Sequence, residues 1–500
     1  MTQMITRRRL RIAMALFAAA MLPLGVAPAV TYAAVVPVVT AIAVGYGHTC
    51  ALTTGEGAKC WGYGLHGALG TGTATTSLTP VGVAGLTSGT IAIAASNFYN
   101  CSLSTAGGVQ CWGWNRSGQL GNGTRITSLT PVDVLGLATG VSAVSADGAH
   151  ACALTSGGGV KCWGNNGVGQ LGDGTKASYN STPVEVSGMA SGATAIAAGG
   201  GHTCVLTTGR GVICWGYNAD GQLGNGSIAW SSLPVAVSGL PSGVAAIAAG
   251  GSHTCALTSS GGVKCWGFNS GGQLGNGTTA RSSTPVDVAG LTSGVSAIAA
   301  GNNYTCALTI GGGVRCWGFN NFLGQLGNGK TINSSTPVNV VGLTSGVAAI
   351  SAGYSHTCAL MNRGGVKCWG YNGYGQLGNG TRTNSKVPVD VDFATHQTIA
   401  LRASESAGTI VPGTAVTFSA TVRPLGPSGE RATVRFEIYR LDAGVWRLAA
   451  RRDVAADATG RASLRWTFVT TGSRYVRAQA LANAAYAASR WSPRINYTVG

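Results

Sequence analysis

The sequence has few charged residues and very few acidic ones, which limits the chemistry it can perform. Only 9% of the residues are charged, and 15 of the 500 are Asp or Glu. Four carboxylates occupy the same position of a recurring Pro-Val-x-Val segment, namely Asp133, Glu185, Asp287 and Asp390. A position that recurs in this way indicates a solvated strand surface, whereas acid–base catalysis needs carboxylates that converge on one substrate. Catalysis by paired carboxylates is therefore not expected.

Several enzyme and ligand motifs are missing as well. The sequence contains neither a Gly-x-Ser-x-Gly nucleophile motif nor a His-Glu-x-x-His zinc motif. Dense runs of Lys or Arg are also absent from residues 35–500, so the net charge of +17 indicates a solvated basic surface and no nucleic-acid partner. We predict a protein that is not an enzyme and that needs no cofactor.

Long apolar runs are absent except near the N-terminus. Four arginines (Arg7, Arg8, Arg9, Arg11) precede an apolar run over residues 12–27, and small-residue cleavage sites follow at 27–29 and 33–34. This layout predicts a secretory signal peptide over residues 1–34, with a membrane anchor as the alternative reading. We expect an exported, secreted chain with no membrane span after cleavage.

What the sequence has in abundance is repetition. Its 14 cysteines fall into seven pairs, each separated by ten residues, and successive pairs are 51 or 52 residues apart. The pairs are Cys50 and Cys60, Cys101 and Cys111, Cys152 and Cys162, Cys204 and Cys214, Cys255 and Cys265, Cys306 and Cys316, and Cys358 and Cys368. One unit of about fifty residues surrounds every pair, which is typical of a repeat architecture.

Each unit contains four short β-prone runs separated by Gly, Asn, Ser and Thr. In the seventh unit these runs are 348–352, 356–360, 366–370 and 387–391. Four strands in a repeat of this length are typical of propeller blades, so residues 36–393 are predicted to form a seven-bladed β-propeller. Residues 35–39 and 388–391 are both available to complete one shared blade, so the way the ring closes stays open.

The cysteine spacing agrees with a hairpin in which Cys358 lies opposite Cys368 and Leu360 lies opposite Val366. Directly opposed residues have Cα atoms about 4.5–5.5 Å apart, within reach of a disulfide. Trp369 is then expected on the other face of the blade. Metal binding by cysteines with nearby histidines is the alternative, but no fourth ligand recurs. An even set in an exported chain favours disulfides, no metal site, and structural histidines.

The repeat is similar to a known family. The unit Gly-x-x-His-Thr-Cys-Ala-Leu-Thr, followed by Gly-Gly-Val-Lys-Cys-Trp-Gly and by Gly-Gln-Leu-Gly-Asn-Gly, resembles the regulator of chromosome condensation (RCC1) repeat in its secreted bacterial, cysteine-paired form. This resemblance implies a seven-bladed propeller. The family's best-known member is a guanine-nucleotide exchange factor for a nuclear GTPase, which an exported chain would not meet. Secreted propellers that inhibit β-lactamases are similar in fold class and suit the expected compartment better.

Positions that vary between units are candidates for binding. The residue after each Trp-Gly is aromatic in six of seven units: Tyr63, Trp114, Tyr217, Phe268, Phe319 and Tyr371. If these residues emerge at one end of the barrel they form a candidate aromatic ring that can contact a protein or stack on a sugar. Packing between blades is the alternative.

The cysteine repeat stops before residue 398, and the rest alternates with period two at 414–422 and 433–440. Further strands are expected at 462–468 and 473–480, which predicts an Ig-like β-sandwich over residues 398–500. The segment resembles bacterial Ig-like domains, which implies a spacer or attachment unit.

The sequence therefore predicts an exported, monomeric binding protein whose propeller face recognises an extracellular protein, such as an enzyme that it inhibits, or a glycan. A structural or adhesive surface protein is the alternative. Exchange-factor activity rests on the family name alone.

Overall fold

The computed structural model describes residues 37–55, 57–320 and 322–393 almost without interruption. Beyond these it describes 398–403, 408–410, 415–423, 433–442, 445–456, 461–467, 472–480 and 495–499. Residues 36–394 form one compact unit and residues from 395 onward belong to another. The predicted signal peptide lies outside the described residues. The described residues form strands, with one short 3-10 helix, η1 (Leu65–Gly67).

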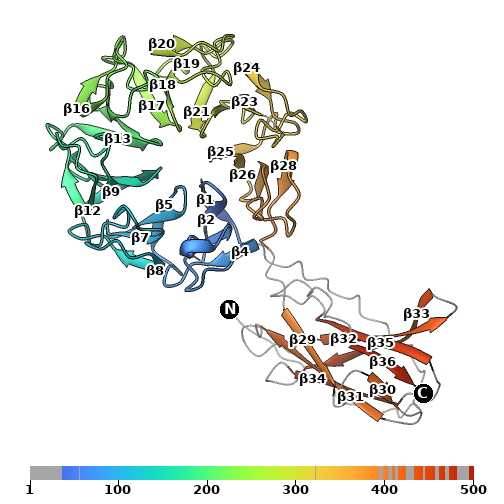
Figure 1. Ribbon diagram of the computed structural model, residues 1–500. Helices are drawn as coiled ribbons and strands as arrows, with labels where there is room; N and C mark the ends of the chain where they lie inside the picture. Colours follow the sequence, from blue (N-terminus) through green and yellow to red (C-terminus); the bar gives the residue numbers. More distant parts are fainter. Residues whose placement is uncertain are drawn as a thin grey trace, which may run out of the picture. The chain divides into compact units, whose positions relative to one another are not determined.

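The larger unit contains seven four-stranded sheets arranged around a central axis (Figure 1). The innermost strands are β1 (Val39–Val44), β5 (Thr90–Ala95), β9 (Val141–Asp147), β13 (Ala193–Ala198), β17 (Val244–Ala249), β21 (Val295–Ala300) and β25 (Val347–Ala352). The second strands are β2 (His48–Thr53), β6 (Tyr99–Ser104), β10 (His150–Thr155), β14 (His202–Thr207), β18 (His253–Thr258), β22 (Tyr304–Thr309) and β26 (His356–Met361).

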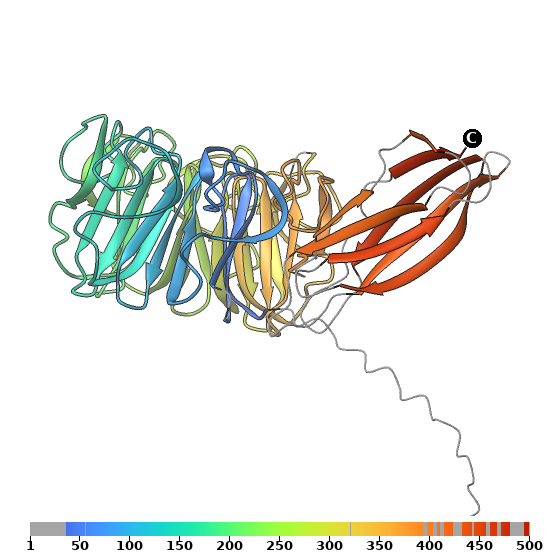
Figure 2. The ribbon, with the colours of Figure 1, turned by 90° about the horizontal axis from the view of Figure 1, so that it is seen from below.

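The two outer positions of each sheet complete the blade. The third strands are β3 (Gly57–Gly62), β7 (Val109–Gly113), β11 (Val160–Asn165), β15 (Val212–Gly216), β19 (Val263–Gly267), β23 (Val314–Gly318) and β27 (Val366–Gly370). The outermost strands are β4 (Ser77–Gly82), β8 (Ser128–Asp133), β12 (Tyr179–Glu185), β16 (Ser231–Ala236), β20 (Ser282–Asp287), β24 (Ser334–Asn339) and β28 (Ser385–Asp390). Viewed from the side, these strands run roughly along the axis of the ring (Figure 2).

The predicted seven-bladed, all-β propeller is thus confirmed, and the open question of closure is answered. Every blade consists of four consecutive strands, including the seventh, which is built from β25–β28 alone. Within the described residues, no strand is shared between the two ends of the ring. Blade 7 instead packs on blade 1 through one apolar cluster that joins Leu360 and Val366 to Trp61 and Ala51. The ring is therefore closed by the same kind of packing that joins its other blades.

The hairpin between the second and third strands has the predicted register. Cys358 lies opposite Cys368 and Leu360 opposite Val366. The structure joins the two cysteines of each of the seven pairs by a disulfide, with Cα atoms 4.0–4.1 Å apart, closer than the expected separation. No free cysteine is found among the described residues. Each bridge therefore lies within one blade.

The two faces of a blade meet different neighbours. On one face, Cys306, Leu308 and Val314 of blade 6 pack against Trp369 of blade 7, whose indole is fully buried. The cysteines of blade 7 lie on the opposite face, in the cluster with blade 1. Gly327 allows this close packing, because a Cβ there would lie 2.7 Å from Nε1 of Trp369. Tryptophan and cysteine on alternate positions thus supply the two sides of every interface.

Hydrogen bonds repeat across these interfaces. His253 Nε2 lies 2.9 Å from Thr305 Oγ1 of the next blade, and that hydroxyl donates to the carbonyl of Gln273 at 3.0 Å. The indole of Trp317 donates to the same carbonyl at 2.9 Å. Because the threonine hydroxyl donates to the glutamine carbonyl, it accepts from the histidine, which must carry its proton on Nε2. These histidines therefore connect adjacent blades, in agreement with their predicted structural role.

Blade 2 departs from this pattern in a compensated way. Ala68 replaces glutamine in blade 1, and Asn100 replaces threonine opposite it, where its amide donates to the Ala68 carbonyl at 2.6 Å and its oxygen lies 2.7 Å from His48 Nε2. Tyr99 replaces histidine and donates from its hydroxyl to the His150 carbonyl. Ala151 stands where other blades have threonine, whereas blade 7 keeps Thr357 opposite Tyr304, and its hydroxyl lies 3.0 Å from that of Tyr304. Each substituted polar side chain at these interfaces thus has a hydrogen-bond partner on the adjoining blade, as buried polar groups require.

The smaller unit contains two sheets. One is ordered β29 (Thr398–Ala403), β31 (Ala415–Arg423), β34 (Arg461–Thr467), and the other β30 (Gly408–Ile410), β36 (Ile495–Val499), β35 (Gly472–Ala480), β32 (Thr433–Asp442), β33 (Val445–Ala455). Phe418 and Ala462 of the first sheet share a core with Phe436, Ile438 and Val476 of the second. The four predicted strands are all present within one or two residues of their expected bounds.

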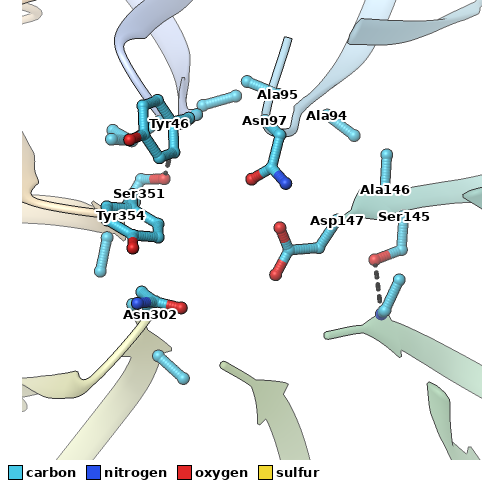
Figure 3. Close-up of a pocket in the computed structure, with 18 of the residues that line it drawn as sticks. Tyr46, Ala94, Ala95, Asn97, Ser145, Ala146, Asp147, Asn302, Ser351 and Tyr354 are labelled. Atoms are coloured by element: carbon cyan, nitrogen blue, oxygen red, sulfur yellow. Dashed lines mark hydrogen bonds between the residues drawn. The ribbon is translucent and has the colours of Figure 1, made fainter. Parts of the chain in front are cut away.

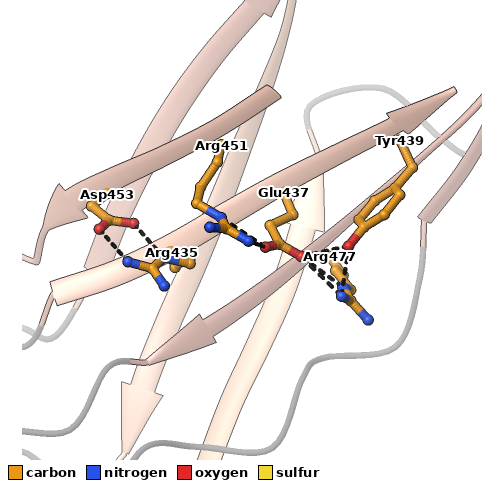
Figure 4. Close-up of polar contacts among 6 residues, drawn as sticks. All are labelled: Arg435, Glu437, Tyr439, Arg451, Asp453 and Arg477. Carbon is orange, nitrogen blue, oxygen red and sulfur yellow. Dashed lines mark hydrogen bonds and ion pairs between the residues drawn. The ribbon is translucent and has the colours of Figure 1, made fainter. Parts of the chain in front are cut away.

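The side of β32 away from this core is polar (Figure 4). Glu437, which is 1% exposed, accepts hydrogen bonds from Arg451 at 2.6 Å and Arg477 at 2.9 Å, and from the Tyr439 hydroxyl at 2.8 Å. Burial alone would raise the pKa of Glu437, but these hydrogen bonds lower it below its ordinary value. The carboxylate is therefore held ionised by groups of its own sheet, which makes it a structural feature.

Candidate binding face of the propeller

The residues that follow each Trp-Gly lie at equivalent places at one end of the ring. The backbone N–H of Tyr63 donates to Gly47 O at 2.8 Å, and that of Trp114 donates to Phe98 O at 3.0 Å. The same bond recurs for Tyr217, Phe268, Phe319 and Tyr371 with the turn that precedes the second strand of their own blades. All six predicted aromatics are half-buried. They therefore stand beside the turns that surround one mouth of the central channel.

The six aromatics do not form an even ring of contacts. Tyr63 and Trp114 both contact Phe98, with ring centroids 5.3 and 6.4 Å apart. Tyr371 contacts Tyr374 at 5.8 Å, and Tyr374 contacts Tyr63 at 4.8 Å. In contrast, Tyr217 contacts only Trp230, and Phe268 and Phe319 have no ring contact among the described residues. Aromatic contacts are thus concentrated on blades 7, 1 and 2.

Three residues that sequence reasoning missed complete this group. The ring centroids of Phe98 and Tyr46 lie 5.1 Å apart, and those of Tyr46 and Tyr354 lie 4.3 Å apart. Each of the three residues lies in the turn between the first and second strands of its own blade. His66 contacts Phe98 at 6.1 Å. We call the whole group the aromatic sector: Tyr46, Tyr63, His66, Phe98, Trp114, Tyr354, Tyr371 and Tyr374. The sequence did contain a sign that this turn varies between blades, because blade 4 has only glycine (Gly199–Gly201) where blades 1, 2 and 7 have these aromatics.

The aromatic sector is open to solvent. Tyr354 is 43% exposed, and His66 is also exposed. Burial raises the pKa of Tyr46, and the neighbouring tyrosines, beginning with Tyr354, raise it further. Burial and Tyr374 act in the same direction on Tyr63. A surface of contiguous rings is suited to contact with a partner molecule, because aromatic side chains bury large areas at low entropic cost.

A cavity of about 320 Å³ opens beside the aromatic sector, in the central channel. Its walls are Ala, Val, Ile and Ser of the innermost strands, and its mouth carries Tyr46, Asn97, Asp147, Asn302 and Tyr354 (Figure 3). Backbone hydrogen bonds between blades frame this mouth, including Tyr46 N to Ser96 O at 3.0 Å and Asn302 N to Gly353 O at 3.1 Å. The mouth is therefore a rigid part of the ring that can hold a small polar group.

No catalytic or metal constellation is found in the described part of the chain. No group of three His, Cys, Asp or Glu side chains lies close enough to hold a metal ion there. Residues 324–331 match the letters of a phosphate-binding loop, Gly-x-x-x-x-Gly-Lys-Thr. They lie, however, between β23 and β24, where coil and a strand follow. That segment lacks the helix N-terminus which phosphate binding requires. The described residues also contain no helix long and apolar enough to cross a membrane.

Comparison with known proteins agrees with the geometry. The profile of the Regulator of chromosome condensation (RCC1) repeat matches residues 106–154, 158–206, 211–257, 260–308, 311–360 and 363–404, more than half of the chain. A second profile of the same repeat matches residues 39–68 in the first blade and five later segments. The Ultraviolet-B receptor UVR8 of Arabidopsis thaliana is 31% identical over 371 residues, which are 72% of this chain and 84% of that protein.

Solved structures show the same fold. Human WBSCR16 is 27% identical, with a TM-score of 0.59 over 66% of this chain and 93% of that one. Yeast RCC1 (Prp20), in its structure bound to Kap60, is 24% identical with a TM-score of 0.59 over 72% of this chain and 85% of that one. The repeat, the seven four-stranded sheets and these similarities together show that the chain belongs to the RCC1 repeat family.

Proposed function

We propose that this protein is a non-enzymatic binding protein that recognises a protein partner through the aromatic sector of its propeller. The observation that carries the proposal is the asymmetry of the face: eight rings from three blades are in contact, whereas the other described blades have at most the one pair Tyr217 and Trp230. Two related structures have named protein partners: yeast RCC1 (Prp20) is bound to Kap60, and Prp20p binds Gsp1p and histones. Family propellers therefore offer precedent for protein binding.

We further propose that the protein works outside the cytoplasm. Seven disulfides within one unit, with no free cysteine in the described residues, suit an oxidising compartment. Cell fractionation together with N-terminal sequencing of the mature chain tests this. Recovery outside the cytoplasm with an N-terminus between residues 28 and 36 is expected. A cytoplasmic chain that retains Arg7–Arg11 would contradict it.

The smaller unit is proposed to be an Ig-like sandwich that spaces the propeller from an attachment point. Its sheets of three and five strands share one core, which supports a sandwich. Three of its arginines, Arg435, Arg451 and Arg477, pair with Asp453 or Glu437 within one sheet, which supports a structural role for these charges.

The test compares two sets of aromatic substitutions in the full chain. A triple variant, Tyr63→Ala, Phe98→Ala and Trp114→Ala, removes the centre of the aromatic sector. A double variant, Phe268→Ala and Phe319→Ala, removes equivalent aromatics outside it. Immobilised wild type, triple and double variants are exposed to medium from the producing organism and its neighbours, and retained proteins are identified by mass spectrometry.

We expect a protein that the wild type and the double variant retain and the triple variant does not. Thermal unfolding of each variant shows whether the ring is intact. Equal retention by the triple variant would contradict the proposal. A large loss of stability in the double variant would instead favour the packing interpretation of these aromatics.

A further inference from the structure

The mouth of the channel is lined unequally. Tyr46 and Tyr354 stand on one side of the opening, and Asp147 projects into it from the other, with Asn97 and Asn302 between them (Figure 3). Where blades 1 and 7 have these tyrosines, blades 3, 4 and 5 have Gly148, Gly200 and Gly251. The glycine side leaves the carboxylate uncovered. One acidic group therefore faces two aromatic rings across a cavity of about 320 Å³.

Among the described residues, no cationic side chain pairs with Asp147. The cavity lining contains no Lys, Arg or His, and the carboxylate accepts one hydrogen bond, from the N–H of Gly148 at 2.7 Å. Among the titratable groups around it, His150 lies opposite Asp147 in the β9–β10 register, Tyr99 lies behind it on β6, and Tyr46 and Tyr354 line the same cavity. A partly buried carboxylate without a counter-charge is costly, and a bound cation would compensate that cost.

We propose that the channel mouth binds a single alkylammonium or guanidinium group, which pairs with the Asp147 carboxylate and faces the rings of Tyr46 and Tyr354. A ring face attracts a cation through its quadrupole, and the amides of Asn97 and Asn302 supply oxygen acceptors for the remaining N–H donors. The cavity lies at the small end of the range for ligand sites, about 300–1,000 Å³, which suits one side chain or a small amine. The inference rests on the proposed function, because a cation site at the channel mouth would make the binding face of the propeller prefer partners with a positive charge.

Binding should depend on pH in a defined direction. Burial raises the pKa of Asp147 to about 6, against the lowering effect of the Gly148 hydrogen bond. The carboxylate is therefore ionised at pH 7.5 and mostly protonated at pH 5, so affinity for a cation should fall as the pH is lowered. His150, whose pKa burial lowers to about 4, stays mostly neutral over this interval, and burial raises the pKa of Tyr46 and Tyr99.

The test uses the full chain and simple probes, followed by calorimetry or ligand-observed NMR. Butylammonium and butylguanidinium are titrated at pH 7.5, with butanol as the neutral control. A capped pentapeptide with one lysine is compared with the same peptide containing norleucine. Asp147→Asn removes the charge while its side-chain oxygen can still accept from Gly148 N–H. Asp133→Asn, on the outermost strand β8, is the matched control.

We expect the two cations and the lysine peptide to bind, and butanol and the norleucine peptide not to bind. Asp147→Asn should weaken cation binding at least tenfold, whereas Asp133→Asn should leave it unchanged. Lowering the pH to 5 should weaken binding about tenfold. A lysine peptide that binds more tightly than butylammonium identifies a partner's side chain as the source, and the reverse order identifies a free amine. No saturable cation binding up to about 50 mM, or equal binding by Asp147→Asn, would overturn the inference. These titrations need no protein partner. If the wild type retains a protein partner but binds no amine, the cation site is refuted and the proposed function stands.

Discussion

The interfaces between blades repeat the same side chains around the ring, whereas the turns at the channel mouth differ from blade to blade. Histidine, threonine and tryptophan recur at the interfaces, and the departures Asn100 and Tyr99 each keep a hydrogen-bond partner on the adjoining blade. At the mouth, the equivalent turns carry Tyr46, Asn97 or only glycine. No such partner is needed there, because these side chains face the open channel.

The contrast separates residues that maintain the ring from residues available for recognition. A substitution at an interface leaves a cavity or an unpaired polar group in the interior, which costs stability. A substitution at the mouth mainly alters what the surface can contact. Variants in the two regions should therefore differ in kind, with stability lost in one case and binding in the other.

Acid should produce the largest difference between the two regions. Burial lowers the pKa of His48, His150 and His253 to about 4, and that of His202 and His356 to about 3. Below pH 6.5 the unfolded chain takes up protons that the folded chain does not, so stability falls from pH 6.5 toward pH 4. At pH 5 the loss is about 2 kcal/mol for each histidine and about 10 kcal/mol for all five.

Denaturant titrations of the full chain at pH 7 and pH 5, followed by tryptophan fluorescence, measure this loss. Asp147, whose pKa is raised, acts in the opposite direction as a single group and offsets only part of it. His253→Gln should reduce the dependence by about one-fifth. Equal midpoints at the two pH values would show that the interfaces do not hold neutral histidines.

Two tryptophans allow the same substitution to be compared in both regions. Trp317 is fully buried and donates to Gln273 O at 2.9 Å, whereas Trp114 is half-buried in the aromatic sector. We expect Trp317→Ala to cost about 3–5 kcal/mol of unfolding free energy, and Trp114→Ala about 1 kcal/mol. Urea unfolding midpoints of the two variants check this. A similar loss in both would remove the distinction between interface and mouth.

The smallest effect is expected where a departure from the repeat is structurally equivalent to the usual residue. Asp173 replaces the asparagine of the Asn-Gly turn, and its carboxylate accepts from the N–H and hydroxyl of Thr175 at 2.9 and 2.8 Å. Asn122 makes the same two bonds to Thr124 in blade 2. Asp173→Asn should therefore change the melting temperature by no more than the equivalent of about 0.5 kcal/mol. A larger shift would assign this loop a role of its own.

The sequence alone predicted the parts of the molecule that depend on local pairing. The ten-residue cysteine spacing placed Cys358 opposite Cys368 and Trp369 on the other face, because strand side chains alternate. The histidines were expected to be structural, but their partner, a threonine on the next blade, follows only from how blades stack. In the same way, Tyr46 and Tyr354 are 308 positions apart, and only ring closure brings them together.

Hydrogen exchange of the full chain, alone and with a protein partner retained by the wild type, tests the central claim most directly. The claim predicts protection at residues 45–48, 96–99, 353–356 and 371–374, with little change in the equivalent turns of blades 4 and 5. Protection at the hairpin loops between the second and third strands, which lie at the opposite end of the blades, or spread evenly over all seven mouth turns, would contradict it.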